Sequence, residues 1–182
     1  MQNRPISNHP FRHGLRWLIL FALLLAGCRA DQATKIWAHS HFQDEQTLTL
    51  IPNLLEFRYA ENRAIAFSMF HQLPDKVRTP LIFSLSGVAF AALLSVIWKM
   101  RNQSLGRLAP LALILAGAVG NLTDRLTHGY VVDFVHVHWR DAWSFPIFNL
   151  ADSMITVGTT LLLALSMLKP AREQESGRWL GA

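Results

Sequence analysis

Two aspartates, Asp133 and Asp152, lie in polar motifs beside apolar segments that approach the length of a membrane span. Carboxylates in such places cost about 2.5–3.5 kcal/mol each on insertion scales, so their presence indicates a function. Two carboxylates a few ångströms apart cannot both ionise easily, and they share one proton. The ionised member takes a proton from water, and the protonated member donates to a substrate carbonyl. The pattern therefore predicts acid–base hydrolysis by a coupled pair.

The same polar spacing occurs twice, at the end of one apolar segment and at the start of the next. Residues at i, i+3 and i+4 share one side of a helix end. When the two segments run in opposite directions, these sides meet at one depth, with Asp133 on the loop between them. Asp152 then lies in the first turn of a helix, where the macrodipole favours its anion. The two sets are Asn121, Asp124 and Arg125, then Asn149, Asp152 and Ser153.

Each of these carboxylates also has a purely structural interpretation. Asp133 or Asp152 alone is explained equally well by helix capping, or by an aspartate–arginine pair that holds two helix ends together. For Asp124, which directly precedes Arg125, the structural pair is the favoured interpretation.

The composition is that of an integral membrane protein. Of 182 residues, 51% are hydrophobic and only 16% are charged, against about 25% charged in soluble proteins. The length suits one domain, and a single cysteine, Cys28, excludes an intrachain disulfide. The basic residues flank apolar runs and form no patch with interleaved aromatics, so we exclude nucleic acid as a partner.

Four apolar segments predict an α-helical membrane protein with four transmembrane helices. A span needs about 20 residues, and Ala112, Ala116 and Gly120 form a ridge of small residues that allows close helix packing. Residues 14–168 are the expected four-helix domain, between cytoplasmic tails 1–13 and 169–182. The predicted spans are 15–36, 80–98, 108–125 and 146–168.

Basic residues predict the orientation. In a four-span chain both termini lie on one side, and this side carries an excess of Lys and Arg near the segment ends, as cytoplasmic sides do. Residues 29–80 and 123–146 then face outward, and the two polar motifs meet at the outer face. The basic residues are Arg4, Arg12, Arg16, Lys99, Arg101, Arg107, Lys169, Arg172 and Arg178.

The outer segment after the first span has the alternation of β-strands. Residues 47–50 and 55–59 alternate, with Pro52-Asn53 as a turn between them. A β segment over 47–67 predicts a small periplasmic sheet that forms a platform on the membrane surface. Trp139, Trp143 and other aromatics before the fourth span fit an interfacial belt.

Five motifs, in this order along the chain, resemble those of the lipoprotein signal peptidases, or signal peptidase II. The resemblance covers roughly residues 15–168. The motifs are Asp31-Gln32-Ala33-Thr34-Lys35, Asn62-Arg63-Ala64-Ile65-Ala66-Phe67, Gly120-Asn121-Leu122-Thr123-Asp124-Arg125, Gly129 with Val131-Val132-Asp133-Phe134, and Phe148-Asn149-Leu150-Ala151-Asp152-Ser153.

The resemblance implies an intramembrane aspartic endopeptidase of the bacterial inner membrane, with its active site toward the periplasm. Its substrate is a diacylglyceryl-modified prolipoprotein, cut just before the lipobox cysteine without a cofactor or metal. The phospholipid bilayer and the cyclic peptide globomycin are further implied partners. The family's catalytic pair falls on Asp133 and Asp152. Its supporting polar residues fall on Asp31, Lys35, Asn62, Asn121, Asp124, Arg125 and Asn149.

The chain departs from the family pattern at three positions. Ala64 stands where a glycine is common, and Ile65 where a small residue is common, which predicts a stiffer or bulkier loop near the substrate. Arg29 adds a charge to an already short first span. None of these changes touches the proposed catalytic pair.

Two other functions fit parts of the sequence. Leu25-Ala26-Gly27-Cys28 is an acceptable lipobox after a basic and apolar run, so the chain is alternatively a lipoprotein anchored at Cys28. Alternatively, membrane aspartates mark the path of a small proton or cation transporter, which predicts polar groups spread through the membrane depth.

A metal site is the least favoured interpretation. His128, His136 and His138 lie near Asp133, and the last two would point the same way on an extended loop. No third ligand is matched to them in the sequence, so we expect polar surface rather than a metal.

Overall fold

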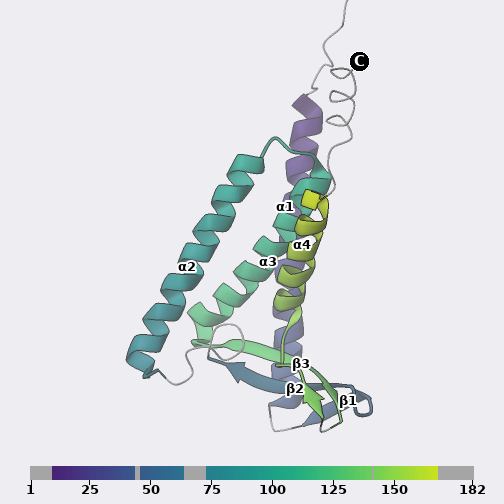
Figure 1. Cartoon of the computed structure of the whole chain (residues 1–182), viewed down its shortest axis with the longest axis vertical. Coiled ribbons are helices and arrows are strands. Elements are labelled where there is room, and N and C mark those ends of the chain that lie inside the picture. The colour runs from purple at the N-terminus through teal and green to yellow at the C-terminus, as the bar shows by residue number, and fades with distance from the viewer. Residues whose placement is uncertain (1–9, 44–45, 64–72, 141, 168–182) are drawn as a thin grey trace, which may run out of the picture.

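The computed structural model of the chain describes residues 10–43, 46–63, 73–140 and 142–167. Within these residues it contains four long helices and one small sheet (Figure 1). The elements are α1 (Pro10–Phe42), β1 (Thr47–Ile51), β2 (Leu55–Asn62), α2 (Asp75–Met100), α3 (Leu105–His128), β3 (Val131–Trp139), β4 (Trp143–Ser144) and α4 (Leu150–Met167).

Among the described residues, three helices are long and apolar enough to cross a membrane, namely α2 from Lys76, α3 and α4. Many large apolar side chains on the helices are exposed, as side chains in contact with lipid are; Val88, Trp98 and Leu163 are examples. A helical membrane protein with a small antiparallel sheet is therefore confirmed. The helix α1 is not among the three, and it carries Arg16, Arg29, Asp31 and Lys35 along its length.

The helices differ from the predicted spans at their ends. At 33 residues, α1 extends beyond the predicted span 15–36 on both sides, and α3 extends beyond 108–125. In contrast, α4 begins four residues later than predicted. The chain there is extended, because Phe148 forms a β-bridge with Val135. The tail 169–182 lies outside the described residues.

The central helix is α3, which packs against α1 and α4. Its buried positions recur every fourth residue, and this spacing places them on one side of the helix. The predicted ridge of Ala112, Ala116 and Gly120 is confirmed as part of that side. The complete row is Leu108, Ala112, Ala116, Gly120 and Asp124.

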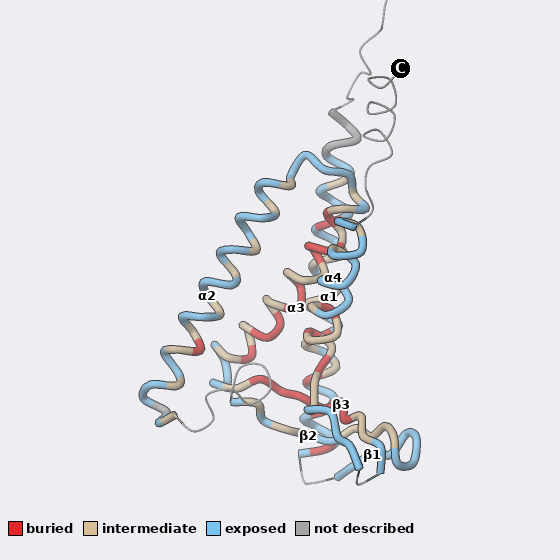
Figure 2. The backbone as a smooth tube through the Cα atoms, viewed as in Figure 1, coloured by how far each residue is buried: buried red, intermediate tan, exposed pale blue. Residues whose placement is uncertain are grey.

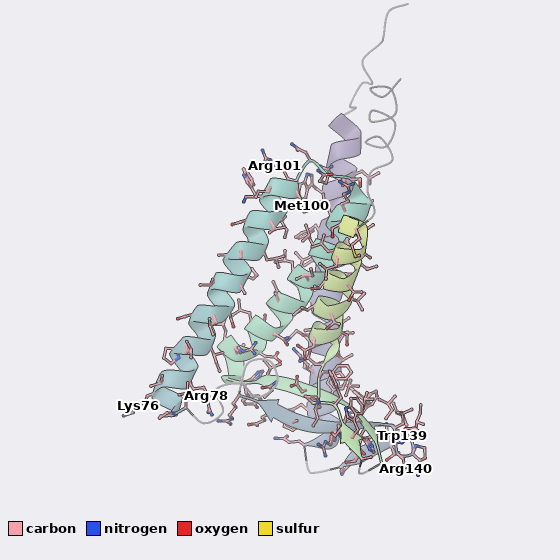
Figure 3. The ribbon with its side chains drawn as sticks, in the orientation of Figure 1. Lys76, Arg78, Met100, Arg101, Trp139 and Arg140 are labelled. Carbon is pink, nitrogen blue, oxygen red and sulfur yellow. The ribbon has the colours of Figure 1, made fainter. Side chains whose placement is uncertain are left out.

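The helix α2 stands away from the other helices at its N-terminal end (Figure 1), while near its C-terminal end Leu93, Ile97 and Met100 pack against the core cluster that includes Leu20 and Leu108. Most of α2 is exposed (Figure 2), and Ile82 is the buried residue among its described side chains. Lys76 and Arg78 lie at one end and Arg101 at the other (Figure 3). Its 26 residues span about 39 Å, enough to carry these charges to the two sides of a bilayer.

The sheet lies across one end of the helices (Figure 1), with strand order β1-β2-β3-β4 and antiparallel pairing throughout. Asn53 has a φ of 62°, which asparagine tolerates, and this confirms the predicted turn between β1 and β2. Phe57 and Phe134 lie edge to face at 5.9 Å and pack against Ala38 and Phe42 of α1. Apolar packing therefore fixes the sheet to the first helix.

Asp133 was expected on a loop, and this expectation is wrong. It lies within β3, opposite Ala60 of β2. The predicted outer segment 123–146 likewise contains all of β3 and β4. The β segment predicted for 47–67 divides into β1 and β2, while residues 64–67, with Ala64 and Ile65, lie outside the described residues.

Candidate active site

Asp133 is held by amide groups from two other elements. Gly129 ends α3 in the left-handed conformation, with φ 80°, and this turns the chain into β3. The Asp133 side chain is almost fully buried, at 2% exposed. Its Oδ2 accepts a hydrogen bond from Asn62 Nδ2 at 2.9 Å, and its Oδ1 accepts one from Asn149 Nδ2 at 2.6 Å.

Asp152 and Asn149 form a reciprocal cap at the start of α4. The Asp152 backbone N–H donates to Asn149 Oδ1 at 2.9 Å, and the Asn149 backbone N–H donates to Asp152 Oδ2 at 3.2 Å. This is the geometry of a capping box, which satisfies two donors that a helix start otherwise leaves unpaired. Asp152 therefore does cap α4, as its structural interpretation predicts.

The same asparagine joins the two aspartates. Asn149 is fully buried and bonds to Asp133 through its side chain and to Asp152 through its cap. Asn121 of α3 adds a second link, because its Nδ2 donates to Asp152 Oδ1 at 2.8 Å and its Oδ1 accepts from Asn149 at 3.2 Å. The two polar motifs therefore meet through Asn149 and Asn121, as their spacing predicts.

A buried ion cluster supports the pair from the side of α1. Lys35 is 3% exposed, and its ammonium lies 2.8 Å from Asp31 and 3.0 Å from Asp124. It also donates to Asn121 Oδ1 at 3.0 Å. The other Asp31 oxygen accepts the Ala151 backbone N–H at 2.9 Å. Lys35 thus has three partners, and the cluster ties α1 to both helices of the site.

Two glycines of α3 allow this helix to approach α1 and α4 closely. A Cβ at Gly120 would overlap the Asp31 carboxylate. One turn away, a Cβ at Gly117 would overlap the Ala151 carbonyl. The helix α3 therefore reaches α1 and α4 only because these two positions have no side chain, which extends the small-residue ridge that the sequence predicts.

The expected pair between Asp124 and Arg125 is corrected. Asp124 pairs with Lys35 instead, accepts Gln32 Nε2 at 2.9 Å, and accepts the Val132 backbone N–H at 3.0 Å. Neighbouring residues on a helix point in different directions, so Arg125 faces another way. Its Nη1 donates to the Asn121 carbonyl at 3.3 Å. Its charge interacts with those of Asp152, Asp133 and, more weakly, Asp124.

Burial separates Asp133 from an ordinary aspartate. Burial, followed by the nearby Asp152 carboxylate, raises the pKa of Asp133 to about 7. The hydrogen bonds from Asn62 and Asn149 oppose this rise but do not cancel it. A pKa of about 7 means that Asp133 holds its proton in part of the molecules near neutral pH and in nearly all of them in mild acid.

The structure brings together all nine residues predicted for the site, and it adds one more. This is Gln32 of the first motif, which donates to Asp124 at 2.9 Å and reaches Asp31 at 3.4 Å. Outside the site, His136 and His138 have the third polar partner that the sequence did not reveal, Glu56 of β2. The alternation of Val135-His136-Val137-His138 is the local signal that both histidines lie on one side of a strand, while Glu56 joins them through the pairing of β2 with β3.

Solved structures share this architecture. A bacterial membrane enzyme determined at 1.9 Å resolution matches with a TM-score of 0.71 and 26% identity, over 84% of this chain and 94% of that one. A second bacterial membrane enzyme, at 2.3 Å, matches with a TM-score of 0.68 and 27% identity, over 84% and 92%. The fold is thus that of a bacterial membrane enzyme.

Sequence comparison gives the family. Residues 21–168 match the model of the signal peptidase (SPase) II family, and the chain belongs to that family. A lipoprotein signal peptidase of Pseudomonas fluorescens is 40% identical over 165 residues, which cover 89% of this chain and 92% of that protein. One from Clostridium tetani is 36% identical over 143 residues, covering 78% and 87%.

Proposed function

We propose that the chain is an aspartic endopeptidase that removes the signal peptide from diacylglyceryl-modified prolipoproteins, cutting before the lipobox cysteine. The signal peptidase II family supplies the reaction class, and its members named lipoprotein signal peptidase supply the substrate class. The single observation that supports Asp133 and Asp152 as the catalytic pair is the Asn149 bridge, which binds both in a buried site.

The mechanism follows from the two environments. The ionised Asp152 takes a proton from a water molecule, whose oxygen attacks the carbonyl carbon of the scissile peptide bond. The protonated Asp133 gives its proton to the carbonyl oxygen, so a neutral tetrahedral intermediate forms. Asp152 then passes its proton to the leaving nitrogen, the carbon–nitrogen bond breaks, and Asp133 takes its proton back. Each aspartate thus ends in its starting state.

The supporting residues divide into two roles. Asp31, Lys35 and Asp124 form the ion cluster that fixes α1 to α3, and we assign them to structure. Asn121 and Asn149 orient the carboxylates. The two remaining predicted site residues, Asn62 and Arg125, are then available to hydrogen-bond to the substrate backbone, whose N–H and C=O groups need partners away from water. The contact between Asn62 and Asp133 would keep this amide beside the reacting bond.

We further propose four spans, with both termini in the cytoplasm and the site at the outer face of the inner membrane. The basic residues at the cytoplasmic segment ends support this orientation. The packing of α1 against α3 and α4 supports α1 as a fourth span, because a helix in contact with two spanning helices shares their environment. Phospholipid would then surround the exposed apolar side chains, and globomycin would bind at the same site.

The two alternative functions receive less support. Cys28 lies inside the continuous helix α1, with its Sγ 3.7 Å from the Ala116 carbonyl. Cleavage before it would cut α1 beside the ion cluster. A transport path needs polar groups through the membrane depth, whereas Asp31, Lys35 and Asp124 gather at the end of the bundle next to β3.

The test replaces each aspartate by its amide. Asp133→Asn and Asp152→Asn should each abolish prolipoprotein cleavage in a gel-shift assay while the protein still accumulates in the membrane. Glu61→Gln is the matched control, because Glu61 is an exposed carboxyl on β2 that pairs with Arg63. Wild-type turnover in either aspartate variant would refute the assignment.

A further inference from the structure

A cluster of three metal-ligand side chains lies on the sheet, apart from the aspartate pair. Glu56 stands directly opposite His136 in the pairing of β2 with β3, and His138 follows two residues later on the same side. His136 Nδ1 lies 2.7 Å from Glu56 Oε1, and His138 Nε2 lies 3.8 Å from Glu56 Oε2. The two imidazole rings stack at 4.9 Å.

The spacing suits a common metal. One nitrogen or oxygen from each residue lies within 4.8 Å of the others. Ligands about 2.0–2.1 Å from a tetrahedral zinc ion lie about 3.4 Å from one another. The contacts of 2.7 Å to Glu56 Oε1 and 3.8 Å to Glu56 Oε2 fall on the two sides of that value, and either carboxylate oxygen can serve as the ligand. Side-chain shifts of roughly 1 Å would therefore bring the three atoms around one ion.

The second nitrogen of each histidine is already occupied in the way that metal ligation requires. His136 Nε2 lies 2.8 Å from Ser144 Oγ, and His138 Nδ1 lies 3.4 Å from the Arg140 carbonyl. Without an ion, the 2.7 Å contact of His136 Nδ1 with Glu56 Oε1 is a hydrogen bond in which the imidazole N–H donates. A metal ion would replace this proton, and with the remaining protons on the nitrogens facing Ser144 and Arg140, the lone pairs of His136 Nδ1 and His138 Nε2 would be left for the ion. Histidines that bind metals donate their other N–H in this manner, which fixes the tautomer.

The carboxylate is available to an ion. Arg58 is its competing partner, with the guanidinium Nε 3.9 Å from Glu56 Oε1. Its side chain is 46% exposed, so the guanidinium moves into solvent at little cost.

We propose that Glu56, His136 and His138 bind one divalent transition-metal ion of the zinc class. Two imidazoles and one carboxylate are ligands that zinc accepts, and water completes the tetrahedron. The ion would join β2 to β3 about 10 Å along the strand from Asp133, near the sheet tip marked by Trp139 and Arg140 (Figure 3). It therefore stabilises the sheet that carries one catalytic aspartate and takes no part in hydrolysis.

The test measures metal binding directly. The full chain, purified in detergent without a polyhistidine tag and stripped with a chelator, is titrated with Zn²⁺ against a chromophoric chelator. One equivalent should bind, and Co²⁺ should give the visible spectrum of a tetrahedral site. His138→Ala and Glu56→Gln should each weaken Zn²⁺ binding at least tenfold, as should Ser144→Ala through His136. His128→Ala, at the end of α3, should bind as the wild type does.

Thermal unfolding shows whether each variant is folded, so that a loss of Zn²⁺ binding is not mistaken for misfolding. Zn²⁺ should raise the unfolding temperature of the wild type and leave that of folded His138→Ala unchanged. Asp133→Asn should still bind Zn²⁺, so failure of the protease assignment would leave this proposal intact. Equal Zn²⁺ affinity in the wild type, His138→Ala and Glu56→Gln would overturn the metal-site proposal. Absence of binding at micromolar Zn²⁺ would also overturn it. The cluster would then be a hydrogen-bonded polar group only.

Discussion

Replacing Gly120 by alanine should destabilise the chain by about 2–4 kcal/mol. A Cβ at this position overlaps the Asp31 carboxylate, which must move. That movement breaks its bond to the Ala151 N–H, worth about 1.5–3 kcal/mol for a charged acceptor. It also disturbs a buried pair with Lys35, whose full disruption costs about 3–5 kcal/mol. Alanine has a better helix propensity than glycine, which offsets about 0.5–1 kcal/mol of this destabilisation. The pair of Asp31 with Lys35 is expected to be weakened and not lost, so the net destabilisation is about 2–4 kcal/mol.

Gly87→Ala is the matched control. Gly87 is also inside a helix, α2, and a Cβ there meets nothing within 4 Å. Thermal unfolding in detergent, followed by the fluorescence of the tryptophans, compares the two variants. At about 2–4 °C per kcal/mol for a chain of this size, Gly120→Ala should unfold about 5–15 °C below the wild type. Gly87→Ala should unfold at or slightly above it.

A double-mutant cycle identifies the cause. In Asp31→Ser the carboxylate that meets the new Cβ is absent, so adding Gly120→Ala should cost little more. Equal unfolding temperatures for Gly120→Ala and Gly87→Ala would show that α3 does not pack closely against α1. A Gly120→Ala cost that is undiminished in the Asp31→Ser background would show that something other than this carboxylate limits the approach.

Further predictions concern the pH dependence, the substrate contacts and the topology. Between pH 3.8 and about 7, the folded chain keeps a proton on Asp133 that the unfolded chain has already released. The free energy of unfolding should therefore fall as pH rises through this window, and Asp133→Asn should flatten that slope. Cleavage should also slow above about pH 7, where Asp133 loses the proton it donates. Asn62→Ala should slow prolipoprotein cleavage about fivefold to 150-fold, for a loss of 1–3 kcal/mol, and an unchanged rate would remove Asn62 from the site. Reporter fusions after residue 105 and at the C-terminus should report cytoplasm, and those near 45 and 140 the outside; an outward C-terminus would contradict the four-span orientation.

The meeting of the two polar motifs was predictable because helix periodicity is a local property. Asn121 and Asp124 fall on adjoining turns of one helix, and Asn149 and Asp152 on the first turn of another, whatever the rest of the chain does. Their approach required only that consecutive apolar segments run in opposite directions. The glycine-containing ridge on α3 was readable for the same reason.

Partners that lie far apart in the sequence were not predictable in this way. Asp124 pairs with Lys35 of α1 rather than with its neighbour Arg125, because packing of two helices decides which side chains meet. The alternation of Val135-His136-Val137-His138 indicates a strand, but no local pattern specifies its pairing register with β2. Glu56 stands beside His136 only through the same register.

The pair of Asp31 and Lys35 has a consequence for the order in which the protein assembles. The two residues are one helical turn apart, so α1 carries a cation together with its own counter-ion. Synthesis proceeds from the N-terminus, so both residues of this pair have been made before Asp124, and under the proposed four-span topology α1 reaches the membrane first. A neutralised pair enters an apolar environment at less cost than either charge alone. The polar centre of the enzyme thus begins on the first helix to be synthesised, and α3 and α4 complete it as they arrive.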